Sequence, residues 1–388
     1  MSTSIPFDAA AGRTATAAPA TSVAVSDASG TAARAGAWVV LLGTLITTIG
    51  TSWDIQWHNE VGPDTFFTLP HLFLYSGSAI AGFASLAMVL LATSAQRAGR
   101  PLPRLGGTPI RVFGGRLTAP LGYMVSGAGA ASFLLYGLLD LQWHTIYGFD
   151  AVLNTPSHVA LFLSISITMI GSIIVFSAHR DELWGRLGLI SALPILISFA
   201  PIPVDALANL RMPVDPIIIG VVLFAPLLLI LGAAVLAWPG AALAITAATA
   251  VLQGALWWFS PWAAHAYAAA TGLPLRDGLL PRPPSFPSLM PMFLVVAALV
   301  VEGVFWLSRT RGIDLKKLLP VTGLVSGVIL AVGMPLQVLL TNHYAHVPGS
   351  QFVLLAVLGV PLGLLAGYLA GRFAIMLRTL APAAEAAR

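Results

Sequence analysis

Six side chains that can bind a metal ion or carry protons occur as two copies of one pattern. The first copy is Asp54, His58 and His71, and the second is Asp140, His144 and His158. In each copy the aspartate and the first histidine are four residues apart, so on a helix they lie on the same face. The second histidine follows a polar segment and a proline, which suits the first turn of a new helix. Each copy therefore predicts a helical hairpin that brings one carboxylate and two imidazoles to one depth.

One carboxylate and two imidazoles form a facial set of three ligands, which leaves positions on a metal ion open for water, oxygen or substrate. This donor set suits Cu(II), zinc or Fe(II), and the Irving–Williams order gives copper the highest affinity. Two alternatives stay open. The carboxylate can orient an imidazole N–H beside the metal, or the six residues can form a hydrogen-bonded structural or proton-relay network.

The two copies belong to a longer internal repeat with an offset of 86 residues. The repeated residues beyond the ligands are Gln56, Trp57, Gly62, Asp64 and Pro70, which recur as Gln142, Trp143, Gly148, Asp150 and Pro156. Only the last histidine departs from the offset, by one position. We interpret the two glutamines as hydrogen-bond partners of the ligands and the two aspartates as turn residues. Trp53, Trp57 and Trp143 resemble an interfacial aromatic belt.

The composition places these hairpins in a membrane. Of the 388 residues, 57% are hydrophobic and 9% are charged, against about 45–50% and about 25% in soluble domains. The apolar runs approach the ~20 residues that a helix needs to cross the bilayer. We therefore predict an all-α, polytopic membrane helix bundle of about ten transmembrane helices with two repeated helical hairpins. The predicted spans are 36–58, 70–93, 117–143, 156–178, 187–204, 215–238, 240–258, 288–308, 318–340 and 350–373.

Basic residues predict the orientation of the bundle. With the N-terminus inside, only Arg211, Arg276 and Arg282 of the 19 lysines and arginines fall on the outer side, as the positive-inside rule expects. The predicted location is the cell (inner) membrane, with both termini cytoplasmic and the two ligand sets toward the outer side. This placement also accounts for the net charge of +4 without a nucleic-acid partner. The chain has no cysteine, so thiolate metal sites are excluded.

The same reasoning divides the chain into four parts. Residues 1–35 are predicted to be a disordered cytoplasmic tail, 36–178 a duplicated four-helix metal-site region, 187–373 a six-helix membrane region and 374–388 a cytoplasmic tail. The six-helix region carries few polar groups. His265, His343 and His346 are interpreted as solvated side chains, with a further site as the alternative. Glu302 is interpreted as a partner of Arg309 or another basic residue, with proton handling as the alternative.

The spacing of the six ligands resembles that of a known family. Asp54, His58 and His71 are similar to the copper-site motif in the C subunit of the copper membrane monooxygenases, which oxidise methane or ammonia. Asp140, His144 and His158 resemble the second proposed copper site of that subunit, where the first ligand is usually asparagine. The resemblance covers residues 36–178. It implies copper at these six positions, other membrane subunits as partners, and oxidation of a small apolar substrate with O2.

The sequence therefore favours two functions. The first is an integral membrane copper protein that activates oxygen, as a monooxygenase or a subunit of one, beside substrate dissolved in the lipid bilayer. The second is non-enzymatic copper handling, by a transporter or a copper acceptor on the outer side of the membrane. A transporter needs polar groups that continue through the membrane, and the inner halves of these helices carry few ionisable residues.

Overall fold

The chain folds almost entirely into helices. The computed structural model describes residues 20–62, 65–148, 152–279, 283, 284, 286 and 292–380. Within them it forms the helices α1 (Ala20–Glu60), α2 (Leu69–Arg97), α3 (Leu121–Tyr147), α4 (Pro156–Ala178), α5 (Leu183–Phe199), the 3-10 helix η1 (Ile202–Leu210), α6 (Pro216–Leu236), α7 (Ala241–Thr271), α8 (Leu294–Arg311), α9 (Leu315–Thr341) and α10 (Gly349–Leu380). The strands β1 (Pro109–Val112) and β2 (Leu117–Pro120) pair antiparallel.

These helices confirm the predicted all-α membrane bundle. In the described part of the chain, nine helical segments are long and apolar enough to cross a membrane. The remaining long helix, α8, carries Glu302, Arg309 and Arg311 in its 18 residues. A helix satisfies its own backbone hydrogen bonds, which is what a chain in lipid requires. The side of the membrane on which each end lies stays a prediction.

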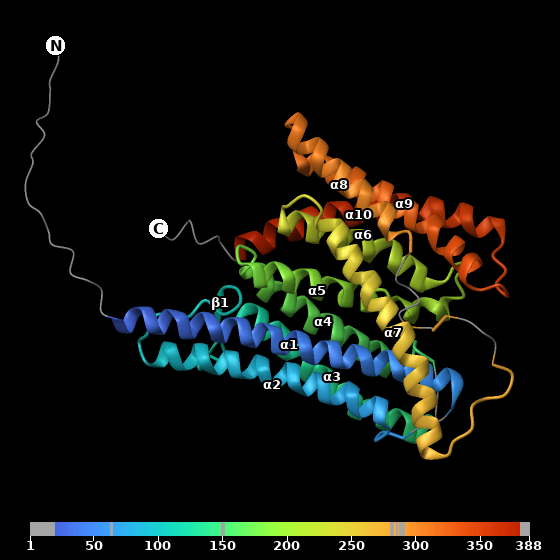
Figure 1. The fold of residues 1–388 in the computed structure, drawn as a ribbon, viewed down its shortest axis with the longest axis horizontal. Helices are drawn as coiled ribbons and strands as arrows, with labels where there is room; N and C mark the ends of the chain where they lie inside the picture. The colour runs from blue at the N-terminus through green and yellow to red at the C-terminus, as the bar shows by residue number, and fades with distance from the viewer. Residues whose placement is uncertain are drawn as a thin grey trace, which may run out of the picture.

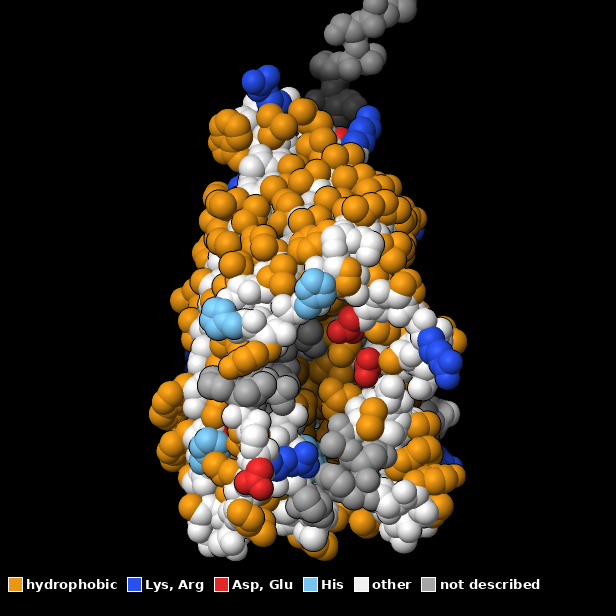
Figure 2. All heavy atoms as spheres, turned by 90° about the vertical axis from the view of Figure 1, so that its right-hand side faces the viewer, with side chains coloured by type: hydrophobic (Ala, Val, Ile, Leu, Met, Phe, Trp, Pro, Cys, Tyr) orange, Lys and Arg blue, Asp and Glu red, His pale blue; other side chains and the backbone are white. Residues whose placement is uncertain are grey.

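The two hairpins lie next to each other in one layer of the molecule. Helices α1 to α4 form the lower part of Figure 1, and α6, α9 and α10 lie above them. Helix α7 contacts α1, α5, α6 and α8, and in Figure 1 it runs across both layers to the end of α1. Figure 2 looks at that end, where histidine and charged side chains surround a hollow, while hydrophobic side chains cover most of the surface above it.

Close backbone contacts hold each hairpin together. A Cβ added to Gly77 of α2 would lie 2.5 Å from the carbonyl oxygen of Gly43 and from the backbone nitrogen of Thr47, both on α1. Gly171 of α4 meets the backbone of Ser126 on α3 even more closely. Small residues at such crossings let membrane helices pack by van der Waals contact. The two ligand sets are thus carried on tightly packed helix pairs.

Several predicted boundaries differ from the structure. The span predicted over 240–258 continues to Thr271 as α7, so His265 lies within the helix and not after it. Residues 20–35 and 374–380 were assigned to the tails, but they extend α1 and α10, because a membrane span nucleates a helix that alanine-rich sequence can continue. Residues 117–120 were predicted to start a span, yet they form β2. The span predicted over 187–204 ends at Phe199, and Pro201 and Pro203 start the 3-10 helix instead. Residues 1–19 and 381–388, and the predicted turn residues Asp64 and Asp150, lie outside the described residues.

The close approach of α1 and α2 gives a stability prediction. We expect Gly77→Ala to destabilise the protein by about 1–3 kcal/mol, because the new methyl group meets backbone atoms that cannot move without separating the helices. The matched control is Gly254→Ala in α7, where nothing lies within 4 Å of the added Cβ. Thermal unfolding in detergent should show a lower midpoint for Gly77→Ala alone. Equal midpoints for the two variants would contradict this packing.

Candidate metal centres

The first ligand set lies at the junction of α1 and α2. Asp54 and His58 are on the last turns of α1, and Gly62, at a φ of 140°, follows the helix. Thr68 is the N-cap of α2, and Pro70 follows in its first turn, where its missing N–H costs no hydrogen bond. His71 thus enters α2 at the level where α1 ends.

Aromatic packing fixes the rotation of α1. Trp53 and Trp57 are 5% and 1% exposed, so their interpretation as an interfacial belt is wrong. Trp53 packs edge-to-face against Phe73 of α2, at 5.7 Å, and Phe259 of α7, at 5.9 Å, and Trp57 lies 4.9 Å from Tyr267 of α7, between ring centroids. One residue further along a helix is about 100° around it. Anchoring the tryptophan face against α7 therefore turns Asp54 and His58 toward α2.

The second ligand set repeats this plan at the junction of α3 and α4. Asp140 and His144 lie on the last turns of α3, which ends before Gly148 at a φ of 82°. Helix α4 starts at Pro156, and the Thr155 side chain caps it by accepting a hydrogen bond from the His158 backbone nitrogen at 3.4 Å. Proline at the first position and a hydroxyl at the cap are strong signals for a helix start.

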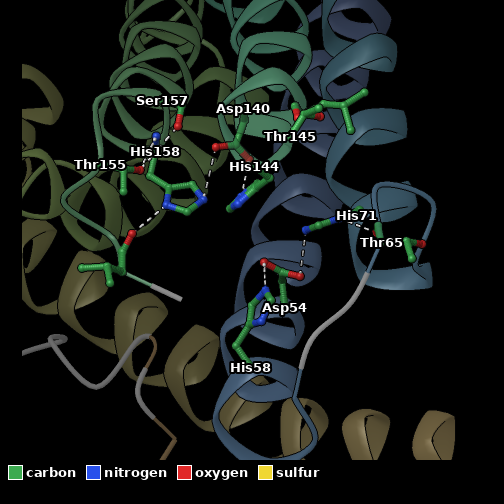
Figure 3. A network of polar contacts seen from close by, with 12 residues as sticks. Asp54, His58, Thr65, His71, Asp140, His144, Thr145, Thr155, Ser157 and His158 are labelled. Carbon is green, nitrogen blue, oxygen red and sulfur yellow. Dashed lines mark hydrogen bonds and ion pairs between the residues drawn. The ribbon is translucent and has the colours of Figure 1, made fainter. Parts of the chain in front are cut away.

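Within each set the ligand atoms converge as the sequence predicts. Oδ1 of Asp54 lies 3.2 Å from Nε2 of His71, and Oδ2 lies 3.7 Å from Nε2 of His58. In the second set, Oδ1 of Asp140 lies 3.5 Å from Nε2 of His158, and Oδ2 lies 3.4 Å from Nε2 of His144. Each set offers three ligand atoms that all lie within 4.8 Å of one another. Figure 3 shows the three side chains of each set pointing toward one another.

The carboxylate–imidazole separations are close to those around one metal ion, and each imidazole of a set faces a different oxygen of its carboxylate. Two ligand atoms about 2.1 Å from one ion, at an angle of about 90–110°, lie about 3.0–3.4 Å apart. The four carboxylate–imidazole distances, 3.2 to 3.7 Å, are at or slightly beyond that range. The six side chains are between 10% and 26% exposed. The sets are therefore partly withdrawn from solvent but still open to it.

The other ring nitrogen of three histidines is held by a backbone carbonyl. Nδ1 of His71 lies 3.1 Å from the Thr65 oxygen, and Nδ1 of His158 lies 2.7 Å from the Val152 oxygen, in both cases six residues earlier. Nδ1 of His144 lies 3.2 Å from the Gly148 oxygen. A carbonyl only accepts hydrogen bonds, so Nδ1 must carry the proton and donate. A neutral ring then directs its Nε2 lone pair toward the carboxylate, which is the tautomer that metal-ligating histidines adopt.

For these three rings, the arrangement requires a positive charge between Nε2 and the carboxylate. A lone pair on Nε2 opposite a carboxylate oxygen gives two acceptors with no proton between them, so either a second proton on the ring or a metal ion must intervene. Oδ1 of Asp54 and Oδ1 of Asp140 are both buried and make no hydrogen bond of good geometry within the described structure. An ion bound by the facing atoms satisfies the carboxylate and the imidazole together.

The two sets are neighbours. Tyr75, one turn after His71, lies against Gly137, one turn before Asp140: a Cβ added to this glycine would be 2.9 Å from the tyrosine ring. Figure 3 shows both sets at this end of the bundle, with His71 and His144 between the two aspartates. Their surroundings differ, because Gln56 is 5% exposed, whereas its repeat partner Gln142 is exposed.

The remaining candidate residues have other roles in the structure. The Glu302 carboxylate accepts hydrogen bonds from the backbone nitrogens of Gly240 and Ala242, at 2.8 and 2.7 Å, so it caps the start of α7. His265 lies 2.9 Å from Oε2 of Glu60 at the end of α1 and joins α7 to the first hairpin. His343 and His346 are exposed. Among the described residues, only the two sets bring three histidine or acidic ligand atoms this close together.

Sequence reasoning did not identify the three carbonyl groups that hold the imidazoles. The shared six-residue spacing of Thr65 to His71 and Val152 to His158 explains why the repeat can slip by one position. The carbonyl and the histidine shift by the same one position in the second copy, so the hydrogen bond from Nδ1 to the carbonyl oxygen is kept. Comparison of the whole chain with protein-family models, curated proteins and solved structures finds no match. The site is therefore argued from its own geometry.

Metal analysis tests this geometry. We expect the purified protein to bind about two metal ions, with one lost in His71→Ala and one in His158→Ala, because each substitution removes one of three ligands. His343→Ala and His346→Ala are controls, since both histidines are exposed and neither belongs to a set. Mass spectrometry of metals after gel filtration gives the count. Unchanged metal content in both ligand variants would mean that the imidazoles are protonated partners of the carboxylates.

Proposed function

We propose that this protein is an integral membrane copper protein whose two Asp–His–His sets support the activation of O2 and the oxidation of a small apolar substrate. One observation carries the proposal. Each carboxylate faces the Nε2 atom of at least one imidazole ring whose Nδ1 atom lies against a backbone carbonyl. The ligand spacing, which resembles that of the copper membrane monooxygenases, supports copper as the metal. Copper at such a site supplies the redox chemistry that O2 requires.

The donor set narrows the metal before any reaction is considered. Two imidazole nitrogens and a carboxylate oxygen suit Cu(II), zinc and Fe(II), and they do not suit Cu(I) as well as thiolate or thioether ligands do. The Irving–Williams order favours copper over the other two ions at a site of this kind. The facial arrangement leaves coordination positions open on the side away from the three ligands.

The surroundings fit a substrate that arrives from the bilayer. The ligand sets lie at the ends of membrane helices, and α3 presents exposed Leu139 and Leu141 beside Asp140. Trp53, Phe73 and Phe259 form an apolar wall behind Asp54. Small apolar molecules dissolve in the hydrocarbon next to such surfaces. In this function the protein orients the ligands and leaves one side of each set accessible.

A monooxygenase reaction places one oxygen atom in the product and releases the other as water, so it also needs electrons and protons from a reductant. The chain has no cysteine for a thiolate or iron–sulfur relay. We therefore assign the delivery of electrons to a separate membrane subunit or a soluble donor. Asp54 and Asp140 are the acidic groups nearest the proposed reaction and would hold the metal together with the histidines.

Copper handling without catalysis is the second candidate. The observation that favours it is the 15–26% exposure of the four histidines, which lets an acceptor or chelator approach. Passage of an ion through the bundle finds less support. Thr44, Thr48 and Thr51 donate to the carbonyls four residues earlier in α1, so their hydroxyls are used within the helix. The small cavity beside Thr44 and Thr168 measures about 10 Å³, at the lower limit for a single water.

Electron paramagnetic resonance distinguishes copper bound by imidazole nitrogens from copper bound only by oxygen ligands. We expect Cu(II) added to the purified protein to give a spectrum with nitrogen hyperfine structure, because two ring nitrogens bind each ion. His58→Ala combined with His144→Ala leaves one ring nitrogen in each set, so the nitrogen hyperfine structure should be reduced at both sites. A competing zinc titration gives the relative affinity. Displacement of copper by equimolar zinc would contradict copper as the resident metal.

Oxygen consumption separates catalysis from copper handling. If the protein is an enzyme, adding copper, a reductant and a short hydrocarbon or ammonia should cause substrate-dependent O2 uptake and form an oxidised product. The rate of O2 uptake should fall at least about tenfold in Asp54→Asn or Asp140→Asn. His343→Ala, at an exposed position outside both sets, retains the rate. The copper-handling function would be supported instead by two results together. The protein would transfer copper to a chelator, and it would form no oxidised product even when the native membrane fraction supplies electrons.

A further inference from the structure

The longest connection between the first four helices is strongly basic and folded. It joins α2 to α3, at the end of the bundle opposite the ligand sets. Residues 97–116, here called the basic hairpin segment, contain five arginines and no acidic residue. The arginines are Arg97, Arg100, Arg104, Arg111 and Arg116, and all five are exposed. A solvated connection of this length would not need a defined strand pair, so its structure calls for a function.

The strand pair presents an aromatic ring between two arginines. β1 and β2 pair from Pro109 with Pro120 to Val112 with Leu117, and the four residues Phe113 to Arg116 form the tip. Phe113 is 71% exposed and adopts a left-handed φ of 52°. A side chain disfavours that conformation, and the two glycines that follow, at 66° and 84°, complete the turn. The tip thus holds a phenylalanine outward in a backbone conformation that is usual for glycine.

Hydrogen bonds fix this hairpin against the end of α2. Thr93 donates to the Thr118 carbonyl at 3.2 Å and accepts from the Thr118 backbone nitrogen at 3.0 Å. Arg97 donates to the Arg116 carbonyl at 2.9 Å. Because α2 ends at Arg97 and α3 starts at Leu121, the hairpin is held at the level where both membrane helices end. In Figure 1, β1 lies at the left-hand end of α1 and α2.

We propose that the basic hairpin segment binds the phosphate groups of anionic phospholipids in the adjacent leaflet, with Phe113 inserted beside the acyl chains. Guanidinium groups recognise phosphate through paired hydrogen bonds, and exposed basic clusters next to membrane helices attract anionic lipids. An aromatic ring at the interface adds an apolar anchor. Arg104 is left out of this surface, because it donates to the Ala178 carbonyl and lies near Glu182.

The position of the segment favours lipid over an acidic protein partner. Lipid phosphates lie at the level where membrane helices end, so Arg100, Arg111 and Arg116 meet them without any docking step. An acidic protein would contact the arginines but would leave Phe113 without an apolar partner. The exposed arginines therefore match the phosphate layer of a bilayer surface, and the exposed phenylalanine matches the acyl chains beneath it.

Lipid binding by the full-length protein tests the charge. Native mass spectrometry of protein in detergent, titrated with phosphatidylglycerol or phosphatidylcholine, should show preferential binding of phosphatidylglycerol. In Arg111→Gln combined with Arg116→Gln, we expect the affinity for phosphatidylglycerol to fall by about 25-fold, at about fivefold for each arginine. Arg309→Gln combined with Arg311→Gln, in the last turn of α8, removes the same charge and should change the affinity less than twofold. Equal losses in the two variants, or none, would overturn the proposal.

Insertion of the tip is tested separately. The chain has no cysteine, so Phe113→Cys carries a single fluorophore in vesicles. Brominated phosphatidylglycerol should quench it more strongly than brominated phosphatidylcholine, and Ile313→Cys in the α8–α9 connection should show no such preference. Equal quenching by the two lipids at residue 113 would contradict a specific anionic site. If an added acidic protein abolished the quenching of the fluorophore at residue 113 by brominated lipid, the segment would bind a protein partner instead. Thermal unfolding of both variants verifies the fold.

Discussion

The structure depends at its polar end on one electrostatic requirement, which is a positive charge between an imidazole and a carboxylate. In both sets an aspartate faces Nε2 atoms at 3.2–3.7 Å, and three of the four rings have Nδ1 against a carbonyl. Without a cation the facing atoms would repel, and the partly buried carboxylate would lack compensation. A metal ion meets the requirement for all three ligands at once, whereas protons must be added to each ring separately.

Meeting that requirement at a helix junction needs accurate control of helix rotation and depth. In the first hairpin, Gly43 and Gly77 set the separation of α1 and α2, and Trp53 and Trp57 hold one face of α1 against α7. Asp54 and His58 are thereby fixed on the neighbouring face. The ion pair of His265 with Glu60 joins α7 to the same helix end. Helix α7, far away in sequence, is thus part of the support of the first ligand set.

The sequence predicts the ligands better than their supports. Spacing alone indicates that Asp54 and His58 share a helix face and that Pro70 and Pro156 open the next helices, because these are local properties of a helix. It does not reveal which distant helix covers a face, so Trp53 and Trp57 resemble an interfacial belt until Phe259 and Tyr267 are seen against them. The carbonyls of Thr65 and Val152 carry no side-chain signal. The strand pair at 109–120 was likewise missed, since a membrane composition favours helices everywhere.

Duplication has produced two equal ligand sets in unequal surroundings. Helix α7 covers the tryptophan face of α1, where Trp53 is 5% exposed, but the corresponding residue of α3, Leu139, is 49% exposed. His144 is accordingly more exposed than His58, at 26% against 15%. Solvent screens charges at an exposed site more strongly, so the attraction between ligands and ion is weaker there. Identical donor atoms therefore do not imply identical affinity, because the histidines are more enclosed in the first set, whereas the aspartate is more enclosed in the second, at 10% exposure against 16%.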